Sequence, residues 1–226
     1  MKICGIDPSI NSSGKCIMTL HDTDYSIQDV AFYGYNMTKN RCFTEGNVDI
    51  FHVGTKFNKM NMFDRQNLVY EFMKKDMDDV RAVAFEGYAF GKSKQGSGSL
   101  IQMGEFIGGL KKLYYDMGMG LVLYPPIVVK RFATGNTKAD KIHMRQAFQA
   151  EYPQFYPAQF NKFEIQDDTP HSDMVDAFWM AETLRCHLIY DVLGSDALNS
   201  GVVALLEYKA TKKSHSIIET EFFKHA

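Results

Sequence analysis

Two acidic residues of this chain stand where short apolar segments end. Asp7 closes residues 2–7 and is followed at once by Pro8, and Glu86 closes residues 81–86. Short apolar runs bounded by turn residues predict buried strands, and ligands gather at the carboxyl ends of such strands in α/β sheets. Asp also commonly caps a turn, so one strand-end carboxylate alone does not distinguish a binding site from a turn.

A second acidic pair, Asp173 and Asp176, lies near the start of a predicted helix. Residues three apart share one face of a helix, so these two carboxylates would point the same way. The helix dipole favours acids at a helix start, which is the ordinary explanation for such a pair. However, residues 177–181 are Ala, Phe, Trp, Met and Ala. This apolar composition predicts a buried helix, whose first acids would then point into the fold.

Together, Asp7, Glu86, Asp173 and Asp176 indicate a metal centre. Four clustered carboxylates repel one another strongly unless a cation compensates their charge. Hard oxygen ligands of this kind select Mg²⁺, and Mn²⁺ is expected to substitute for it. Two such ions activate a water and stabilise a leaving oxygen in phosphodiester hydrolysis. The residue set therefore predicts a metal-dependent phosphodiesterase site.

The elements that must position these acids follow from the apolar periodicity. Strands are predicted over residues 2–7, 14–20, 26–34, 81–86 and 121–124. Helices are predicted over residues 61–79, 99–118, 137–151 and 169–190. This order indicates an α/β fold, a mixed five-stranded sheet with helices on both faces. Residues 1–190 would form this domain, with an insertion at 35–60 and a helical extension or tail at 191–226.

Five blocks of the sequence, in their order and spacing, resemble the RuvC family of Holliday-junction resolvases, within the RNase H-like superfamily. These blocks are Gly5-Ile6-Asp7-Pro8-Ser9, Phe85-Glu86-Gly87, residues 124–130, residues 134–141 and Asp173-Met174-Val175-Asp176-Ala177. The resemblance implies an RNase H-like fold and a structure-selective endodeoxyribonuclease of DNA recombination and repair, which cuts four-way or branched DNA by paired symmetric nicks. It also implies that the four acids are catalytic and hold two Mg²⁺ ions per active site. The length of the chain is closer to phage-encoded relatives than to the short bacterial enzyme.

The resemblance also suggests DNA contacts. Its basic positions facing the DNA backbone correspond to Lys130, Lys138 and Lys141. We add three basic residues near the predicted site as candidates for phosphate contacts, namely Arg145, Lys92 and Lys94. A solvated helix face is the more common explanation for such a run of charges. The aromatic residue that the family inserts into the junction corresponds to Tyr88 or Phe90.

Two further expectations concern the helices. In the family, the helix corresponding to residues 99–118 forms a homodimer. Here it carries more apolar side chains than one face requires, so a second stripe would pair across a two-fold axis, unless the helix is buried in a larger monomer. His171 lies beside the helical acids. It is either a buried residue of the helix start or a support for a metal ligand.

Composition limits the class of protein. The chain has 226 residues and a net charge of −2, which argues against a uniformly basic nucleic-acid coat but is compatible with a basic face. It has no apolar run of about 18 residues, so no membrane-spanning helix is predicted. The four cysteines are scattered, as is typical of reduced thiols. Without a signal pattern, we expect a cytoplasmic protein, in the host cytoplasm if it is phage-encoded.

Two other functions stay open at this point. A non-catalytic junction-binding protein would share the fold, although it has no need of four clustered carboxylates. An actin-like ATPase or sugar kinase also begins with a Gly-x-Asp strand, and Gly5-Ile6-Asp7 fits that pattern. The chain is short for the two domains of such an enzyme, and it lacks a second glycine-rich adenosine motif.

Overall fold

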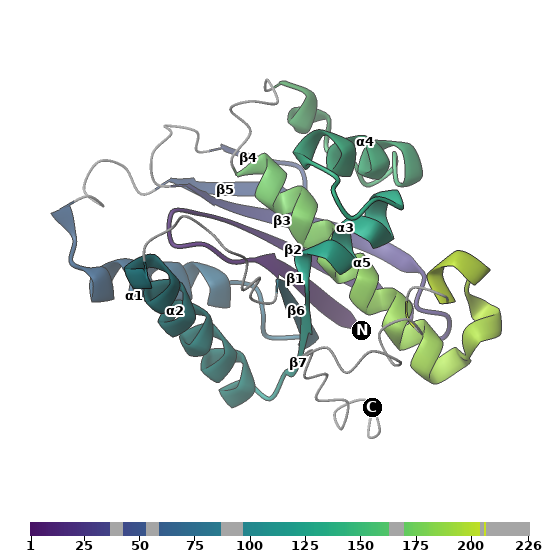
Figure 1. The fold of residues 1–226 in the computed structure, drawn as a ribbon, viewed down its shortest axis with the longest axis horizontal. Helices are drawn as coiled ribbons and strands as arrows, with labels where there is room; N and C mark the ends of the chain where they lie inside the picture. Colours follow the sequence, from purple (N-terminus) through teal and green to yellow (C-terminus); the bar gives the residue numbers. More distant parts are fainter. Residues whose placement is uncertain (37–42, 53–58, 87–96, 163–169, 204–205, 207–226) are drawn as a thin grey trace.

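A single mixed sheet forms the centre of the protein. The computed structural model describes residues 1–36, 43–52, 59–86, 97–162, 170–203 and 206. The strands are β1 (Lys2–Asp7), β2 (Ser12–Leu20), β3 (Ile27–Asn36), β4 (Phe43–Glu45), β5 (Val48–His52), β6 (Val80–Glu86) and β7 (Gly120–Tyr124). They form one seven-stranded sheet in the order β4-β5-β3-β2-β1-β6-β7 (Figure 1). Strands β1, β6 and β7 are parallel, whereas β2 is antiparallel to both β1 and β3.

All five predicted strands are present, and two short ones were missed. Strands β4 and β5 come from residues 35–60, which were expected to be an insertion because they lack clean periodicity. Strand β5 pairs in parallel with β3 and buries only Val48 and Ile50, so its alternation is too short to stand out in the sequence. The sheet therefore has seven strands rather than the predicted five.

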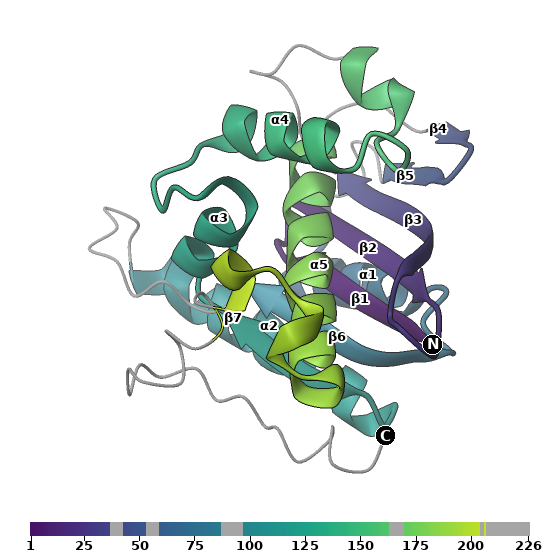
Figure 2. The same cartoon turned by 90° about the vertical axis from the view of Figure 1, so that its right-hand side faces the viewer.

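Helices cover both faces of the sheet. On one face lie α1 (Met62–Lys74) and α2 (Ser97–Asp116). On the other lie α3 (Pro126–Thr134), α4 (Lys141–Glu151) and α5 (His171–Leu193). Figure 2 shows α5 running across the strands, with α1 and α2 behind the sheet. The predicted α/β architecture with helices on both faces is thus confirmed.

Helix α3 was not predicted, and α4 begins later than expected. Pro126 occupies the first turn of α3, where its missing N–H costs nothing and its fixed φ favours the helix. Gly135 ends α3 in the left-handed conformation at φ 72°. Helix α4 begins at Lys141 rather than near residue 137, because the Asp140 side chain caps it by accepting from the backbone N–H of His143.

Two glycines let α5 lie directly on the sheet. A Cβ atom at Gly5 would collide with the backbone of Ala177 and Ala181. A Cβ atom at Gly14 would collide with the backbone of Asp173 and with the N–H of Met174. The backbone of α5 therefore touches β1 and β2, which brings the first turn of α5 to the end of β1.

A buried lysine joins the sheet to α1. Lys15 on β2 is fully buried, and its ammonium donates to the backbone carbonyls of Phe72, Met73 and Lys75 at 3.3, 3.4 and 2.5 Å. It also lies 4.4 Å from the centre of the Tyr33 ring. Burial lowers the pKa of Lys15 to about 8. The positive charge satisfies carbonyls at the end of α1 that have no partner within the helix.

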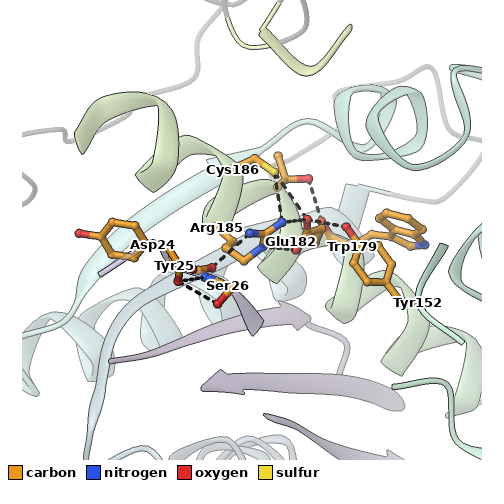
Figure 3. A network of polar contacts seen from close by, with 9 residues as sticks. Asp24, Tyr25, Ser26, Tyr152, Trp179, Glu182, Arg185 and Cys186 are labelled. Atoms are coloured by element: carbon orange, nitrogen blue, oxygen red, sulfur yellow. Dashed lines mark hydrogen bonds and ion pairs between the residues drawn. The ribbon is translucent and has the colours of Figure 1, made fainter. Parts of the chain in front are cut away.

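A second buried polar network ties α5 to its neighbours (Figure 3). Glu182 accepts from Nε and Nη2 of Arg185, each at 2.6 Å, and from the Tyr152 hydroxyl at 2.7 Å. Arg185 also donates to the backbone carbonyl of Tyr25, between β2 and β3. Since α4 ends at Glu151, just before Tyr152, the network links α5 to the end of α4 and to that turn.

Two predictions about composition can also be compared with the fold. Cys4, Cys16 and Cys186 are buried free thiols, as expected for cysteines packed as small apolar side chains, and Cys42 lies outside the described residues. Within the described ranges, no helix has both the length and the apolar character needed to cross a membrane.

Candidate active site

Asp7 and Glu86 stand side by side at the ends of two parallel strands. Ile6 pairs with Phe85 in the register of β1 and β6, so the next residue of each strand is one of these acids. Burial raises the pKa of Asp7 well above its usual range, and the carboxylates of Asp173, Asp176 and Glu86 add to the shift. Burial also raises the pKa of Glu86, against opposing effects from nearby lysines and from a hydrogen bond with Asp7.

Asp173 and Asp176 approach this pair from the first turns of α5. Asp173 is only 5% exposed, and its Oδ1 lies 3.2 Å from the Lys141 ammonium. Its Oδ2 accepts a hydrogen bond from the Ser12 hydroxyl. Burial raises the pKa of Asp176 to about 7; Lys141 acts against this shift, and Asp173 adds to it. The structure thus brings all four acids within one another's electrostatic field, although they come from strands β1 and β6 and from α5.

A small pocket opens at this cluster. Its lining residues are Glu86, Pro126, Val129, Lys130, Met144, Asp176 and Met180. Two acids and one lysine thus share an apolar cavity formed by α3, α4 and α5. Charges interact more strongly in such surroundings than in water.

The donor set fits a hard divalent cation in its chemistry. All four side chains offer only carboxylate oxygens, which suit a hard cation. Burial raises the pKa values of Asp7, Glu86 and Asp176, and neighbouring carboxylates add to each shift, so a bound cation would stabilise the charged forms. Across the described part of the chain, however, no three His, Cys, Asp or Glu side chains converge as a ready-made metal-binding group. Instead, the Asp173 carboxylate accepts a hydrogen bond from the Ser12 hydroxyl and forms an ion pair with the Lys141 ammonium. A bound cation would compete with the Lys141 ammonium for the Asp173 carboxylate.

Of the three basic residues carried over from the resemblance, Lys130 on α3 and Lys141 on α4 lie within the electrostatic field of the acids. Lys130 lines the pocket, and Lys138 is exposed, ahead of α4. Burial acts to lower the pKa of Lys141, but Asp173 and the other carboxylates outweigh it and raise this pKa. Lys141 therefore stays charged beside the cluster.

Arg145 differs from these three lysines in its burial. Its side chain belongs to the buried face of α4, and the residue is 8% exposed. Its Nε donates to the Tyr156 hydroxyl at 2.6 Å. The buried position leaves Arg145 engaged within the protein, and its predicted phosphate contact stays a prediction. A charge run in the sequence did not reveal which face of α4 each cation would occupy.

The remaining predicted residues are His171, whose possible support of a metal ligand stays a prediction, and the DNA contacts expected after Glu86. His171 is fully buried, with its ring 5.3 Å from that of Phe160 in an edge-on contact. It belongs to the aromatic core at the start of α5. The predicted DNA contacts of the loop after Glu86 lie outside the described residues, namely Tyr88, Phe90, Lys92 and Lys94.

Two serines of the site were missed by the sequence reasoning. Ser12 donates to Asp173, and Ser172 accepts from Lys141 at 2.7 Å. Ser172 adjoins Asp173, and Ser12 lies two residues before Gly14, on which the start of α5 rests. The sequence feature that could have identified Ser12 is its position in the turn after Asp7, because a turn that follows a strand-end acid lies close to the residues around that acid.

Comparisons with known proteins identify the fold. No protein-family model and no curated protein matches the chain. The RuvC structure of Thermus thermophilus matches with a TM-score of 0.53 and 17% identity, over 86% of this chain and 98% of that one. RuvC of T. thermophilus in complex with Holliday junction substrate matches with a TM-score of 0.54 and 16% identity, over 86% and 97%. The yeast mitochondrial Holliday junction resolvase Ydc2 matches with a TM-score of 0.51 and 14% identity, over 92% and 81%.

These structural similarities assign the chain to a class of fold and, within that class, to a particular arrangement of helices and strands. The chain has the α/β fold of the RNase H-like proteins. Within that class, its elements follow the arrangement seen in RuvC and Ydc2. The resemblance first drawn from five short sequence blocks is thereby confirmed at the level of the fold. Its extension to phage-encoded relatives stays a prediction.

Proposed function

We propose that this protein is a metal-dependent, structure-selective endodeoxyribonuclease that resolves Holliday junctions or other branched DNA by paired symmetric nicks. One observation carries the proposal. Asp7 and Glu86 end neighbouring parallel strands and meet Asp173 and Asp176 at the start of α5, in a fold shared with resolvases. We assign the nuclease to residues 1–190 and treat residues 191–226 as an extension.

The four acids would hold Mg²⁺ or Mn²⁺, two ions per site. When bound, such ions activate a water and stabilise the leaving oxygen of the phosphodiester. The protein's contribution is to keep its carboxylates desolvated and close together. Since the pKa values of Asp7, Glu86 and Asp176 are raised, protons would compete with a cation for these carboxylates. Metal affinity should therefore rise with pH.

Branched DNA is the proposed substrate. A structural neighbour, T. thermophilus RuvC, is described in complex with Holliday junction substrate. In this chain Lys130 and Lys141 lie beside the acids, and Lys138 is exposed just before α4, so their ammonium groups could contact phosphates near the cut. Lys141 is half exposed, so it can turn from Asp173 toward a phosphate.

A homodimer through α2 would supply the second nick. The second apolar stripe predicted for α2 consists of Ile101, Phe106 and Leu113. It is only partly exposed, because Phe106 is fully buried and Leu113 is half buried. The exposed face instead carries Ile101, Glu105, Gly108, Lys112 and Tyr115. Ile101 and Tyr115 are 61% and 69% exposed, and a Cβ atom at Gly108 would meet nothing within 4 Å.

This face is self-complementary. If two copies of α2 cross antiparallel about Gly108, Glu105 of one copy meets Lys112 of the other, and Ile101 meets Tyr115. A two-fold interface requires that kind of reciprocal pairing. The small residue at the crossing point would let the two helices approach closely. The arrangement supports a dimer with two active sites for two strands.

A cleavage assay tests the proposal. Labelled four-way junction, three-way junction, flap and linear duplex are incubated with Mg²⁺ or with EDTA. We expect symmetric nicks in the four-way junction with Mg²⁺, no cutting in EDTA and an intact linear duplex. Junction binding without any Mg²⁺-dependent cut would instead identify a non-catalytic junction-binding protein. ATP hydrolysis without nuclease activity would favour the ATPase alternative.

A further inference from the structure

The carboxylate of Asp173 is held from two sides by very different groups. The Ser12 hydroxyl at the start of β2 donates to Oδ2, although the two residues are 161 positions apart in the chain. The Lys141 ammonium at the start of α4 lies 3.2 Å from Oδ1. The neighbouring Ser172 hydroxyl also donates to Oδ1, at 3.3 Å. Oδ1 is thus contacted by Lys141 and Ser172, whereas Oδ2 accepts from Ser12.

Ser12 is fixed by the turn that precedes it. The Ser13 hydroxyl accepts from the Ser9 backbone N–H at 2.9 Å and donates to the Ser9 carbonyl at 2.5 Å. Ser12 itself pairs with Asn36 in the register of β2 and β3. Gly14, two residues on, rests on the backbone of Asp173. The hydroxyl is thus presented by a rigid hairpin against the start of α5.

The two donors differ in what they can do when a cation arrives. Lys141 carries a positive charge that competes with the cation, and its side chain is 52% exposed on a flexible stem. Ser12 is neutral, so it can keep its hydrogen bond to Oδ2 while Oδ1 exchanges the ammonium for the ion. A hydrogen bond to a ligating carboxylate fixes its orientation, and loss of such a partner typically weakens metal affinity about 10- to 100-fold.

We infer that Ser12 is a positioning residue that holds Asp173 in the orientation needed to bind the catalytic metal. The inference rests on the proposed function, because it assumes that Asp173 is a ligand. In this role Ser12 would act through Asp173, to which its hydroxyl donates. The competing explanation is that Ser12 merely tethers α5 to the sheet, in which case its loss would lower stability and leave metal affinity unchanged.

Mn²⁺ titration of the metal-stripped full-length protein, followed by calorimetry, separates these explanations. We expect Ser12→Ala to bind Mn²⁺ about 10-fold more weakly than the wild type and Ser12→Thr to restore the affinity, because threonine keeps the hydroxyl. Ser26→Ala is the matched control, since Ser26 donates to Asp24 at 2.8 Å in an exposed turn. Thermal unfolding in EDTA reports the stability of each variant.

Each outcome decides the matter. Equal Mn²⁺ affinity of the wild type and Ser12→Ala would overturn the inference and leave the nuclease proposal intact. Failure of the wild type to bind Mn²⁺ would overturn both. If Ser12→Ala does not fold, Ser12→Cys replaces it, because a thiol fills the same space but donates weakly. Wild-type affinity in a folded Ser12→Cys would then count against the inference.

Discussion

The Nζ atom of Lys141 lies 3.2 Å from Oδ1 of Asp173 and 2.7 Å from the hydroxyl of Ser172. An ammonium from α4 thus lies against the acids of α5 and offsets part of their charge. The same group belongs to the proposed phosphate-binding side of the site. Lys141 is therefore expected to influence metal binding and DNA binding in opposite directions.

Lys141→Met should bind Mn²⁺ several-fold more tightly at pH 8, because a competing positive charge has been removed from the acid cluster. It should bind junctions more weakly, with a salt slope smaller by about one unit. Calorimetry with Mn²⁺ and junction titrations at several salt concentrations measure the two effects. Lys138→Met is the control, because Lys138 is exposed and is expected to change only the salt slope. If Lys141→Met binds Mn²⁺ and junctions as the wild type does, Lys141 belongs to an ordinary solvated helix face and contributes to neither kind of binding.

Asp7→Asn should abolish Mg²⁺-dependent cleavage and keep junction binding, because an amide is a poor ligand for a two-metal site. Burial raises the pKa of Asp7 and so favours its neutral form, which asparagine resembles. The unfolding free energy in EDTA should therefore hardly change. Asp79→Asn, at an exposed residue paired with Lys2, is the control. If Asp7→Asn cleaves junctions near the wild-type rate, Asp7 is not a ligand of the catalytic metal.

The stability of the metal-free protein should depend on pH through Asp176. Its pKa rises from a usual value of 3.8 to about 7 on folding, so between these values the folded state binds more protons than the unfolded state. Stability from this group is therefore greatest near pH 4 and is lost as the pH rises through about 7. Asp176→Asn should melt at a higher temperature than the wild type at pH 8 in EDTA, with the difference closing toward pH 4. Parallel curves for the two proteins across this range would contradict the assignment.

Gly14→Ala should strongly destabilise the protein, because its Cβ atom would collide with the backbone of Asp173 at the start of α5. Overpacking of this kind typically costs about 1–3 kcal/mol, and backbone has little freedom to yield. Urea unfolding gives the free energy. Gly201→Ala is the control, since its Cβ atom would meet only an ordinary contact with Asn199. Equal stability of the two variants would show that α5 does not rest on β2 as described.

Charge reversal on α2 tests the dimer. Glu105→Lys and Lys112→Glu should each weaken self-association, since each places like charges opposite one another across the proposed two-fold axis. The double variant should regain it. Sedimentation equilibrium at micromolar concentration measures the mass, which is 25.8 kDa for one chain. A wild-type mass near that value, unchanged by junction DNA, would contradict the dimer.

Local patterns in the sequence determined the main elements of this fold. The apolar runs ending at Asp7 and Glu86 were sufficient to predict two buried strands, and Ala177–Ala181 predicted a buried helix behind the second acidic pair. These features depend on neighbours along the chain, so periodicity reveals them. The confirmed α/β class follows from their order.

The tertiary structure alone decided which polar groups meet. Lys15 lies in a run that reads as an apolar strand, yet it caps α1 through carbonyls 57 to 60 residues away. Arg145 belongs to a basic run, yet it turns inward to Tyr156. Ser12 reaches Asp173 across 161 residues. A hydrogen bond depends on distances that only the packed elements set, and the sequence carries no periodic signal for it.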